Sequence, residues 1–259
     1  MKSSNGRKYI YEKNQLVELI CQLRFPAILS IETDVPSAFQ EQIRERFPRY
    51  ELREEAFPSP TGLIKQKVHT FVSADGGYKL SLSKNFIALS TMRYTSWEDF
   101  AHWLDEPLGR FINLYKPAFF ERIGLRYLNG FSREKLGLEH CRWNDLIQSR
   151  YLGPLDDDDV DEAAVGKCSV DVEMKLNGCL LRLHAGPGFI KRAVRTPKGI
   201  QQLQEPTPRF IFDQDVYNAG TLQLKDAAAI LENLHSEADR IFSEAITDIL
   251  HDAMEPTEV

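Results

Sequence analysis

Hydrophobic and polar residues alternate with a period of two in many short stretches, which is typical of strands with one buried and one wet face. The clearest case is the segment 16–25, where every second residue is apolar: Val17, Leu19, Cys21, Leu23 and Phe25. Related patterns predict strands at 50–56, 63–73, 78–82, 86–93, 119–129, 167–176, 179–185 and 209–216. The links at 74–77, 84–85 and 177–178 have the composition of hairpin turns, so we expect antiparallel pairing.

Apolar residues spaced by three and four positions predict helices between these strands. One long helix should start after Thr95 or Ser96 and end near Tyr115, because Glu98 and Asp99 then form an acidic first turn. A second long helix is predicted at 224–254, and shorter ones at 35–46, 132–138 and 143–148. The segment 186–208 shows no clear period and is predicted to be irregular.

These elements predict an α+β protein with antiparallel sheets, each covered on one face by a long helix. Each half of the chain consists of strands followed by a helix, which favours two related lobes of ferredoxin-like or TATA-binding-protein-like topology. The expected parts are an N-terminal α+β lobe at 1–130, a helical and acidic connector at 131–165, and a C-terminal β-rich lobe with the terminal helix at 166–259.

The composition indicates a soluble protein of the cytoplasm. Hydrophobic residues make up 42% and charged residues 27% of the chain, which is ordinary for a globular protein. The formal charge of -6 gives no overall attraction to nucleic acid or to an anionic membrane. No stretch approaches the roughly 18 apolar residues of a membrane-spanning helix, and the segment 1–14 lacks the apolar core of a signal peptide. The cysteines form no CxxC pair, which favours buried thiols over a zinc site: Cys21, Cys141, Cys168 and Cys179.

The predicted strand at 119–129 has an unusual polar face. Arg122 and Arg126 share this face and lie four residues, or roughly 13 Å, apart along a strand, with only Gly124 between them on that face. A glycine there would let another backbone or a ligand approach closely. The polar face of the strand at 16–25 carries Glu18 and Arg24. If both strands belong to one sheet, the four charged groups form either a structural ion-pair network or a ligand site for an anion.

Two further charged segments are candidates. The predicted irregular segment contains Lys191, Arg192, Arg195 and Lys198, which could contact the phosphates of a nucleic acid, although a solvated flexible loop is favoured. The acidic run at 156–162 could hold Mg²⁺ or Ca²⁺. Because it lacks the glycine and the terminal glutamate of an EF-hand loop, a solvated loop is favoured there too.

The chain lacks the common sequence motifs of catalysis. The chain has no phosphate-binding GxxxxGK[ST], no GxGxxG after a strand, no GxSxG elbow and no HExxH. The six histidines are scattered, and no pairing of a nucleophile with a base follows from spacing. We therefore predict no catalytic residues, no metal site and no cofactor, and favour a protein that is not an enzyme.

Four stretches of the chain resemble one protein family. They are LVE leading into QLRF, the strand RIGLRYLN with its R-x-G-L-R-Y-x-N pattern, FIFDQDVY, and the ending LENLHSEADRIFSEAITDIL. Together they resemble a sporadically distributed family of uncharacterised bacterial proteins of about 250 residues, over most of the chain. The resemblance implies a bacterial cytoplasmic accessory protein from an anti-phage or toxin–antitoxin type of locus, and it assigns no activity to any residue.

The sequence thus favours a non-enzymatic binding or regulatory component that recognises a partner protein encoded nearby. The alternative is a sensor or enzyme that acts on a phosphorylated small molecule or a nucleic acid through the arginine-lined sheet face. Binding to nucleic acid through the basic segment is a third, less favoured hypothesis. A homodimer is expected if a sheet edge is exposed.

Overall fold

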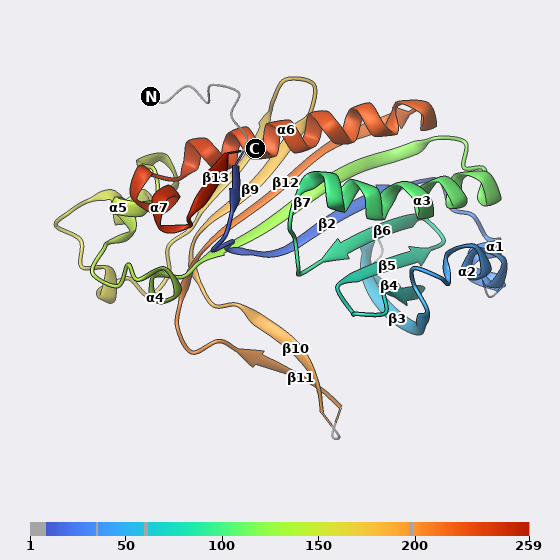
Figure 1. The fold of residues 1–259 in the computed structure, drawn as a ribbon, viewed down its shortest axis with the longest axis horizontal. Helices are drawn as coiled ribbons and strands as arrows, with labels where there is room; N and C mark the ends of the chain where they lie inside the picture. Colours follow the sequence, from blue (N-terminus) through green and yellow to red (C-terminus); the bar gives the residue numbers. More distant parts are fainter. Residues whose placement is uncertain (1–8, 35, 60–61, 197–198, 259) are drawn as a thin grey trace. The chain divides into compact units, whose positions relative to one another are not determined.

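The computed structural model describes residues 9–34, 36–59, 62–196 and 199–258 (Figure 1). Its strands are β1 Tyr9–Tyr11, β2 Leu16–Arg24, β3 Arg49–Ser59, β4 Gly62–Val72, β5 Tyr78–Ser83, β6 Phe86–Thr91, β7 Phe120–Phe131, β8 Val170–Lys175, β9 Leu180–Gly188, β10 Lys191–Thr196, β11 Gly199–Gln204, β12 Arg209–Leu222 and β13 Pro256–Glu258. Its α-helices are α1 Ser30–Thr33, α2 Ser37–Ile43, α3 Trp97–Tyr115, α4 Arg133–Leu136, α5 Trp143–Leu146, α6 Ala227–Ala245 and α7 Asp248–Ala253.

The chain is an α+β protein with a large antiparallel sheet, as the sequence predicts. Nine strands hydrogen-bond in the order β3-β4-β5-β6-β2-β7-β12-β9-β8. Two smaller sheets pair β1 with β13 and β10 with β11. In the described residues no helix is both long and apolar enough to cross a membrane.

The chain divides into two compact units. Unit 1 comprises the described residues of Met1–Val17, Tyr127–Asp215 and Ser236–Val259, and unit 2 comprises Glu18–Arg126 and Val216–His235. The limits of the units therefore fall inside β2, β7, β12 and α6. Boundaries after residues 130 and 165, which the sequence suggests, do not coincide with them, because long strands and a long helix contribute residues to both units.

Unit 2 contains helix α3, which begins and ends where its sequence predicts. The side chain of Ser96 accepts a hydrogen bond from the Asp99 N–H at 3.2 Å, and Lys116 ends the helix in the left-handed conformation. The buried stripe of the helix is Trp97, Phe100, Leu104, Pro107, Leu108 and Phe111. It packs on the sheet, as shown by the contact of Phe25 with Phe111, whose ring centroids are 4.8 Å apart.

The strands of unit 2 place alternate residues on opposite faces. In β2 the apolar set predicted from the sequence is buried, and Cys21 lies opposite Leu89 of β6 in the register. Leu80 of β5 follows opposite Leu89, so apolar residues form continuous rows across the sheet. The helix predicted at 35–46 is observed as α2, and its expected first residue, Val35, lies outside the described residues.

A buried histidine in unit 2 makes the stability of the protein depend on pH. His69 is only 2% exposed, and its Nδ1 lies 3.0 Å from the hydroxyl of Tyr50. Burial lowers the pKa of His69 below its usual value. The unfolded chain takes up a proton near pH 6.5, whereas the folded chain resists it until lower pH. We therefore expect stability to fall as the pH decreases below about 6.5.

This prediction is checked by urea unfolding between pH 5 and pH 7.5. The loss of stability towards low pH should be smaller in His69→Gln than in the natural protein, because glutamine does not titrate. His102→Gln is the matched control, since His102 is exposed. An unchanged pH profile in His69→Gln would contradict the prediction.

Unit 1 ends in two helices where the sequence predicts one. The helix expected at 224–254 is interrupted after Ala245, so that prediction is wrong in its length. Ile246 forms a bridge with Ile147, the Thr247 N–H bonds to the Leu146 carbonyl at 3.0 Å, and the Thr247 side chain caps α7. The backbone at this point pairs with the α5 segment instead of continuing the helix.

Unit 1 also contains strands that alternation does not predict. The segment 186–208 was expected to be irregular, but it ends β9 and forms the antiparallel hairpin of β10 and β11. This expectation is wrong because the segment has few apolar residues, and its pairing comes from backbone hydrogen bonds. The short β1 and β13 pair near the two ends of the chain, with Tyr9 opposite Glu258.

Candidate functional site

The four charged residues predicted on the strand faces, Glu18, Arg24, Arg122 and Arg126, belong to unit 2. Glu18 and Arg24 lie on the face of β2 opposite its buried row. In β2, Glu18, Ile20 and Gln22 are half-buried and Arg24 is exposed. In the register of β2 with β6, Gln22 lies opposite Ala88 and Ile20 lies opposite Ser90. Strand β7 is the other neighbour of β2 in the sheet. Small residues of β6 therefore flank the polar row of β2 on one side, with β7 on the other.

Arg122 of β7 is held by an aromatic side chain. Its guanidinium carbon lies 4.4 Å from the centroid of the Tyr217 ring, and both side chains are half-buried. Such a cation–π contact is worth about 0.5–1 kcal/mol at an exposed position and more when it is desolvated. Tyr217 belongs to β12 and was not predicted from the sequence. We call Glu18, Ile20, Gln22, Arg24, Arg122, Gly124, Arg126 and Tyr217 the arginine face.

Gly124 has a specific role in this arrangement. A Cβ atom at residue 124 would lie 2.8 Å from the guanidinium carbon of Arg122 and would overlap one of its nitrogens. The glycine therefore makes room for the side chain of Arg122 itself, rather than for another backbone or a ligand as the sequence suggests. Arg126, two positions further along β7, is exposed. The two arginines are thus not a buried pair.

The buried side of the same strands offers no reactive group. Burial raises the pKa of the Cys21 thiol far above its usual value, and the nearby positive charge of Arg122 opposes this effect only in part. The thiol therefore stays protonated at neutral pH and is a poor nucleophile. The chemistry that the arginine face can perform is recognition by charge, hydrogen bonds and stacking.

The basic candidates belong to unit 1. Lys191, Arg192 and Arg195 lie in β10, and the side chain of Lys191 is exposed. The side chains of Arg192 and Arg195 and the whole of Lys198 lie outside the described residues. These positions and the arginine face fall in different units.

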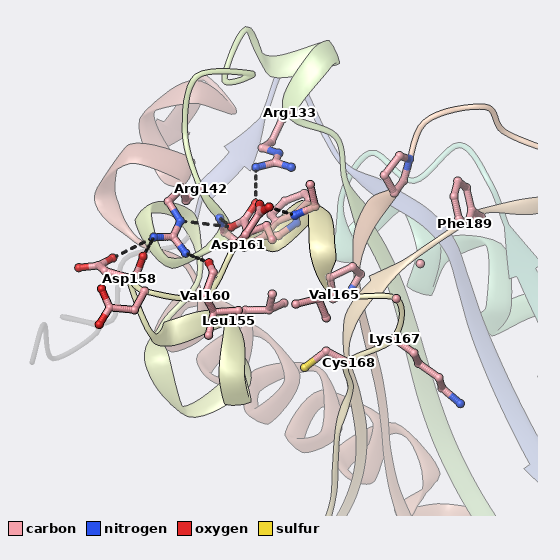
Figure 2. A pocket seen from close by; sticks show the side chains of 18 residues that line it. Arg133, Arg142, Leu155, Asp158, Val160, Asp161, Val165, Lys167, Cys168 and Phe189 are labelled. Atoms are coloured by element: carbon pink, nitrogen blue, oxygen red, sulfur yellow. Dashed lines mark hydrogen bonds and ion pairs between the residues drawn. The ribbon is translucent and has the colours of Figure 1, made fainter.

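Unit 1 also contains a pocket that sequence reasoning missed (Figure 2). Its volume is about 930 Å³, and the acidic segment forms one wall. Trp143 and Leu155 are buried in its lining, whereas Phe189 is 46% exposed at the end of β9. No pattern in the sequence joins these segments, because they are brought together only by the folded chain.

Two arginines of this pocket bind the acidic segment tightly. Arg133 donates to the carboxylate of Glu162 at 2.9 Å, and the other oxygen of Glu162 accepts from the Trp143 N–H at 2.5 Å. Arg142 donates to the carbonyl oxygens of Asp158 at 2.9 Å and Val160 at 2.7 Å, as Figure 2 shows. The arginines of the pocket are thus occupied by groups of the chain itself.

The acidic run contributes to local structure. The carboxylate of Asp157 accepts from the Asp159 N–H at 2.9 Å, and that of Asp161 accepts from the Ala163 N–H at 3.0 Å. Within the part of the chain that the structure describes, no three acidic, histidine or cysteine residues are grouped so that they could hold a metal ion. The aspartates of the run are exposed to solvent, as the sequence favours, while arginine binds carbonyl groups of the loop.

Comparison of the chain with protein-family models gave no match, and neither did comparison with curated proteins.

Proposed function

We propose that this protein is a non-enzymatic binding component that recognises a partner protein through the arginine face. The observation that carries the proposal is the placement of Arg122, whose guanidinium is stacked on Tyr217 and lies over Gly124. An arginine that is already held in one position loses little conformational entropy on binding. Arginine and tyrosine are also the residue types that most often dominate the energy of protein interfaces.

The charge of the arginine face indicates what kind of partner it fits. This face carries the guanidinium groups of Arg24, Arg122 and Arg126 and the carboxylate of Glu18. The half-buried Ile20 supplies apolar surface between the charges. A partner with an acidic patch around an apolar centre complements this surface.

A sensor or enzyme for a phosphorylated small molecule or a nucleic acid is the alternative. Two arginines four positions apart on one strand, Arg122 and Arg126, can each offer a planar fork of donors to phosphate oxygens. The fixed position of Arg122 supports this alternative as well. The two proposals differ in the mass of the bound partner and in their response to the exchange of arginine for lysine.

The cellular location of the protein and the type of system in which it acts are inferred from the family resemblance alone. On that basis we propose that it acts in the bacterial cytoplasm within an accessory system of the anti-phage or toxin–antitoxin type. We also propose a homodimer, and a relation of the two halves to ferredoxin-like or TATA-binding-protein-like lobes.

The test is native mass spectrometry of the protein purified from its own host with the neighbouring genes intact. We expect a stoichiometric complex with another protein. In Arg122→Ala the complex should weaken about 30-fold, because an interface hot spot contributes about 2 kcal/mol or more. Arg126→Ala, at an exposed position, should mainly slow association, reduce the dependence of association on salt, and weaken the complex less than tenfold.

Arg44→Ala is the matched control, because Arg44 is exposed on another part of unit 2. A complex that is equally stable in Arg122→Ala and in the control would exclude the arginine face as the interface. A retained small phosphorylated molecule, lost in the double variant Arg122→Lys and Arg126→Lys, would establish the alternative instead.

A further inference from the structure

Strands β10 and β11 form a two-stranded arm in unit 1. Their register runs from Lys191 opposite Gln204 to Thr196 opposite Gly199. The two strands pair only with each other among the described strands. In Figure 1 the arm, drawn in orange, continues from the ends of β9 and β12 and runs away from both. An isolated two-stranded hairpin of this kind is at best marginally stable in water.

The base of the arm is fixed to unit 1. The Glu205 N–H bonds to the Ile190 carbonyl at 3.0 Å, which closes the hairpin on the side of the unit. The carboxylate of Glu205 forms an ion pair with Arg209, and Arg209 also donates to the Gly130 carbonyl of β7 at 3.3 Å. The arm therefore starts from a defined place and direction in unit 1.

The arm has a charge opposite to that of the whole protein. The segment 189–204 contains Lys191, Arg192, Arg195 and Lys198 and no acidic residue, whereas the formal charge of the chain is -6. Three of these cations lie within five consecutive positions of β10. The facing strand β11 contributes amides, of which Gln202 and Gln204 are exposed. A concentration of positive charge on one projecting element is typical of nucleic-acid binding.

We propose that the β10–β11 arm binds double-stranded DNA in the major groove. The major groove of B-form DNA is about 12 Å wide and admits a two-stranded β-ribbon, whereas the major groove of double-stranded RNA is too narrow. The three positively charged residues that the sequence places in β10 supply charge for the phosphates, and the side chain of Lys191 is exposed. The exposed glutamines of β11 reach base edges, where a glutamine amide pairs with adenine. The arm and the arginine face share no residue, so DNA binding by the arm does not depend on the proposed partner protein.

The test uses the full chain and a fluorescein-labelled 30-base-pair DNA duplex of mixed sequence. Each phosphate contact contributes a slope of about −0.9 to the dependence of log affinity on log salt. The three cations of β10 should therefore give a slope near −2.7, which corresponds to a loss of about 40-fold in affinity between 50 and 200 mM salt. The triple variant Lys191→Gln, Arg192→Gln, Arg195→Gln should lose this slope and bind at least tenfold more weakly at 50 mM salt.

The matched control is the triple variant Arg44→Gln, Lys175→Gln, Lys225→Gln, which removes the same charge from exposed positions on other elements. It should bind the duplex as the natural protein does. The pair Gln202→Ala and Gln204→Ala should lower affinity without changing the slope. Circular dichroism and thermal unfolding of each variant show whether the fold is retained.

Three results would overturn the proposal. The first is an absence of salt-dependent binding to the duplex by the natural protein. The second is an equal loss in the control triple variant, which would indicate a diffuse effect of charge. The third is a homodimer in sedimentation that dissociates in the arm variant without any change in DNA binding, since the arm would then contact a second copy of the chain.

Discussion

Replacement of Glu205 by glutamine is expected to lower the free energy of unfolding by about 3 kcal/mol. Arg209 is 4% exposed, and its guanidinium forms an ion pair with the carboxylate of Glu205. Arginine does not lose its charge in proteins, so the variant leaves a buried cation without its counterion. We choose the lower end of the range for broken buried pairs, because the Glu205 side chain is 22% exposed and partly screened by water.

The measurement is urea unfolding of Glu205→Gln beside Glu173→Gln. Glu173 pairs with Arg182 at 2.8 Å, but both side chains are more than half exposed, so the control should change stability by less than about 1 kcal/mol. The double variant Glu205→Gln with Arg209→Met should recover much of the lost stability, because no buried charge remains. Equal stability of Glu205→Gln and the control would show that the pair contributes nothing at this position.

The expected loss has a consequence for the β10–β11 arm. Glu205 follows β11 and Arg209 begins β12, so the ion pair closes the segment that joins the arm to unit 1. Hydrogen exchange of the amides in β10 and β11 should therefore increase in Glu205→Gln, in addition to the change in global stability.

Alternation and capping allowed much of the fold to be predicted. The buried row of β2 and the start of α3 at Ser96 are encoded by residues close together in the sequence. Such local signals determine which face of a strand is buried and where a helix begins. The coarse α+β class and the antiparallel pairing follow from them, and both are confirmed by the structure.

The incorrectly predicted elements have a common physical cause, which is contact between segments that are distant in the sequence. The predicted helix at 224–254 has a continuous apolar stripe, but backbone pairing of Ile246 with Ile147 interrupts it. Strands β10 and β11 were not predicted because their sequences show no regular alternation, and the two strands pair through their backbones. Neither interaction leaves a periodic pattern in the sequence.

The candidate site was predicted only to the level of a strand face. The sequence places Arg122 and Arg126 on one side of β7, and the structure shows them half-buried and exposed, respectively. It does not indicate that Tyr217 contacts Arg122, because Tyr217 lies 95 positions further along the chain and its neighbour in the sheet is set by strand order. The pocket depends in the same way on contacts between separate segments, in which Arg133 binds the carboxylate of Glu162 and Arg142 binds the carbonyl of Val160.

Replacement of Gly186 by alanine is expected to lower the free energy of unfolding of the protein by about 3 kcal/mol. Gly186 is buried in β9, next to the start of β8. A Cβ atom at this position would overlap the carbonyl oxygen of Cys168 and lie 3.0 Å from the Cα atom of Ser169. Both neighbours belong to the backbone and cannot rotate away, so the two strands must separate or the sheet must shift at this edge.

Gly109→Ala is the matched control, since a Cβ atom at residue 109 of α3 would meet nothing within 4 Å. This variant should raise stability by about 0.5–1 kcal/mol, because alanine is the better helix former. Both variants are compared by urea unfolding, with hydrogen exchange of the β8 and β9 amides as the local measure. A loss of less than about 1 kcal/mol in the free energy of unfolding of Gly186→Ala would contradict the prediction. It would show that close backbone contact at this glycine does not hold β8 against β9.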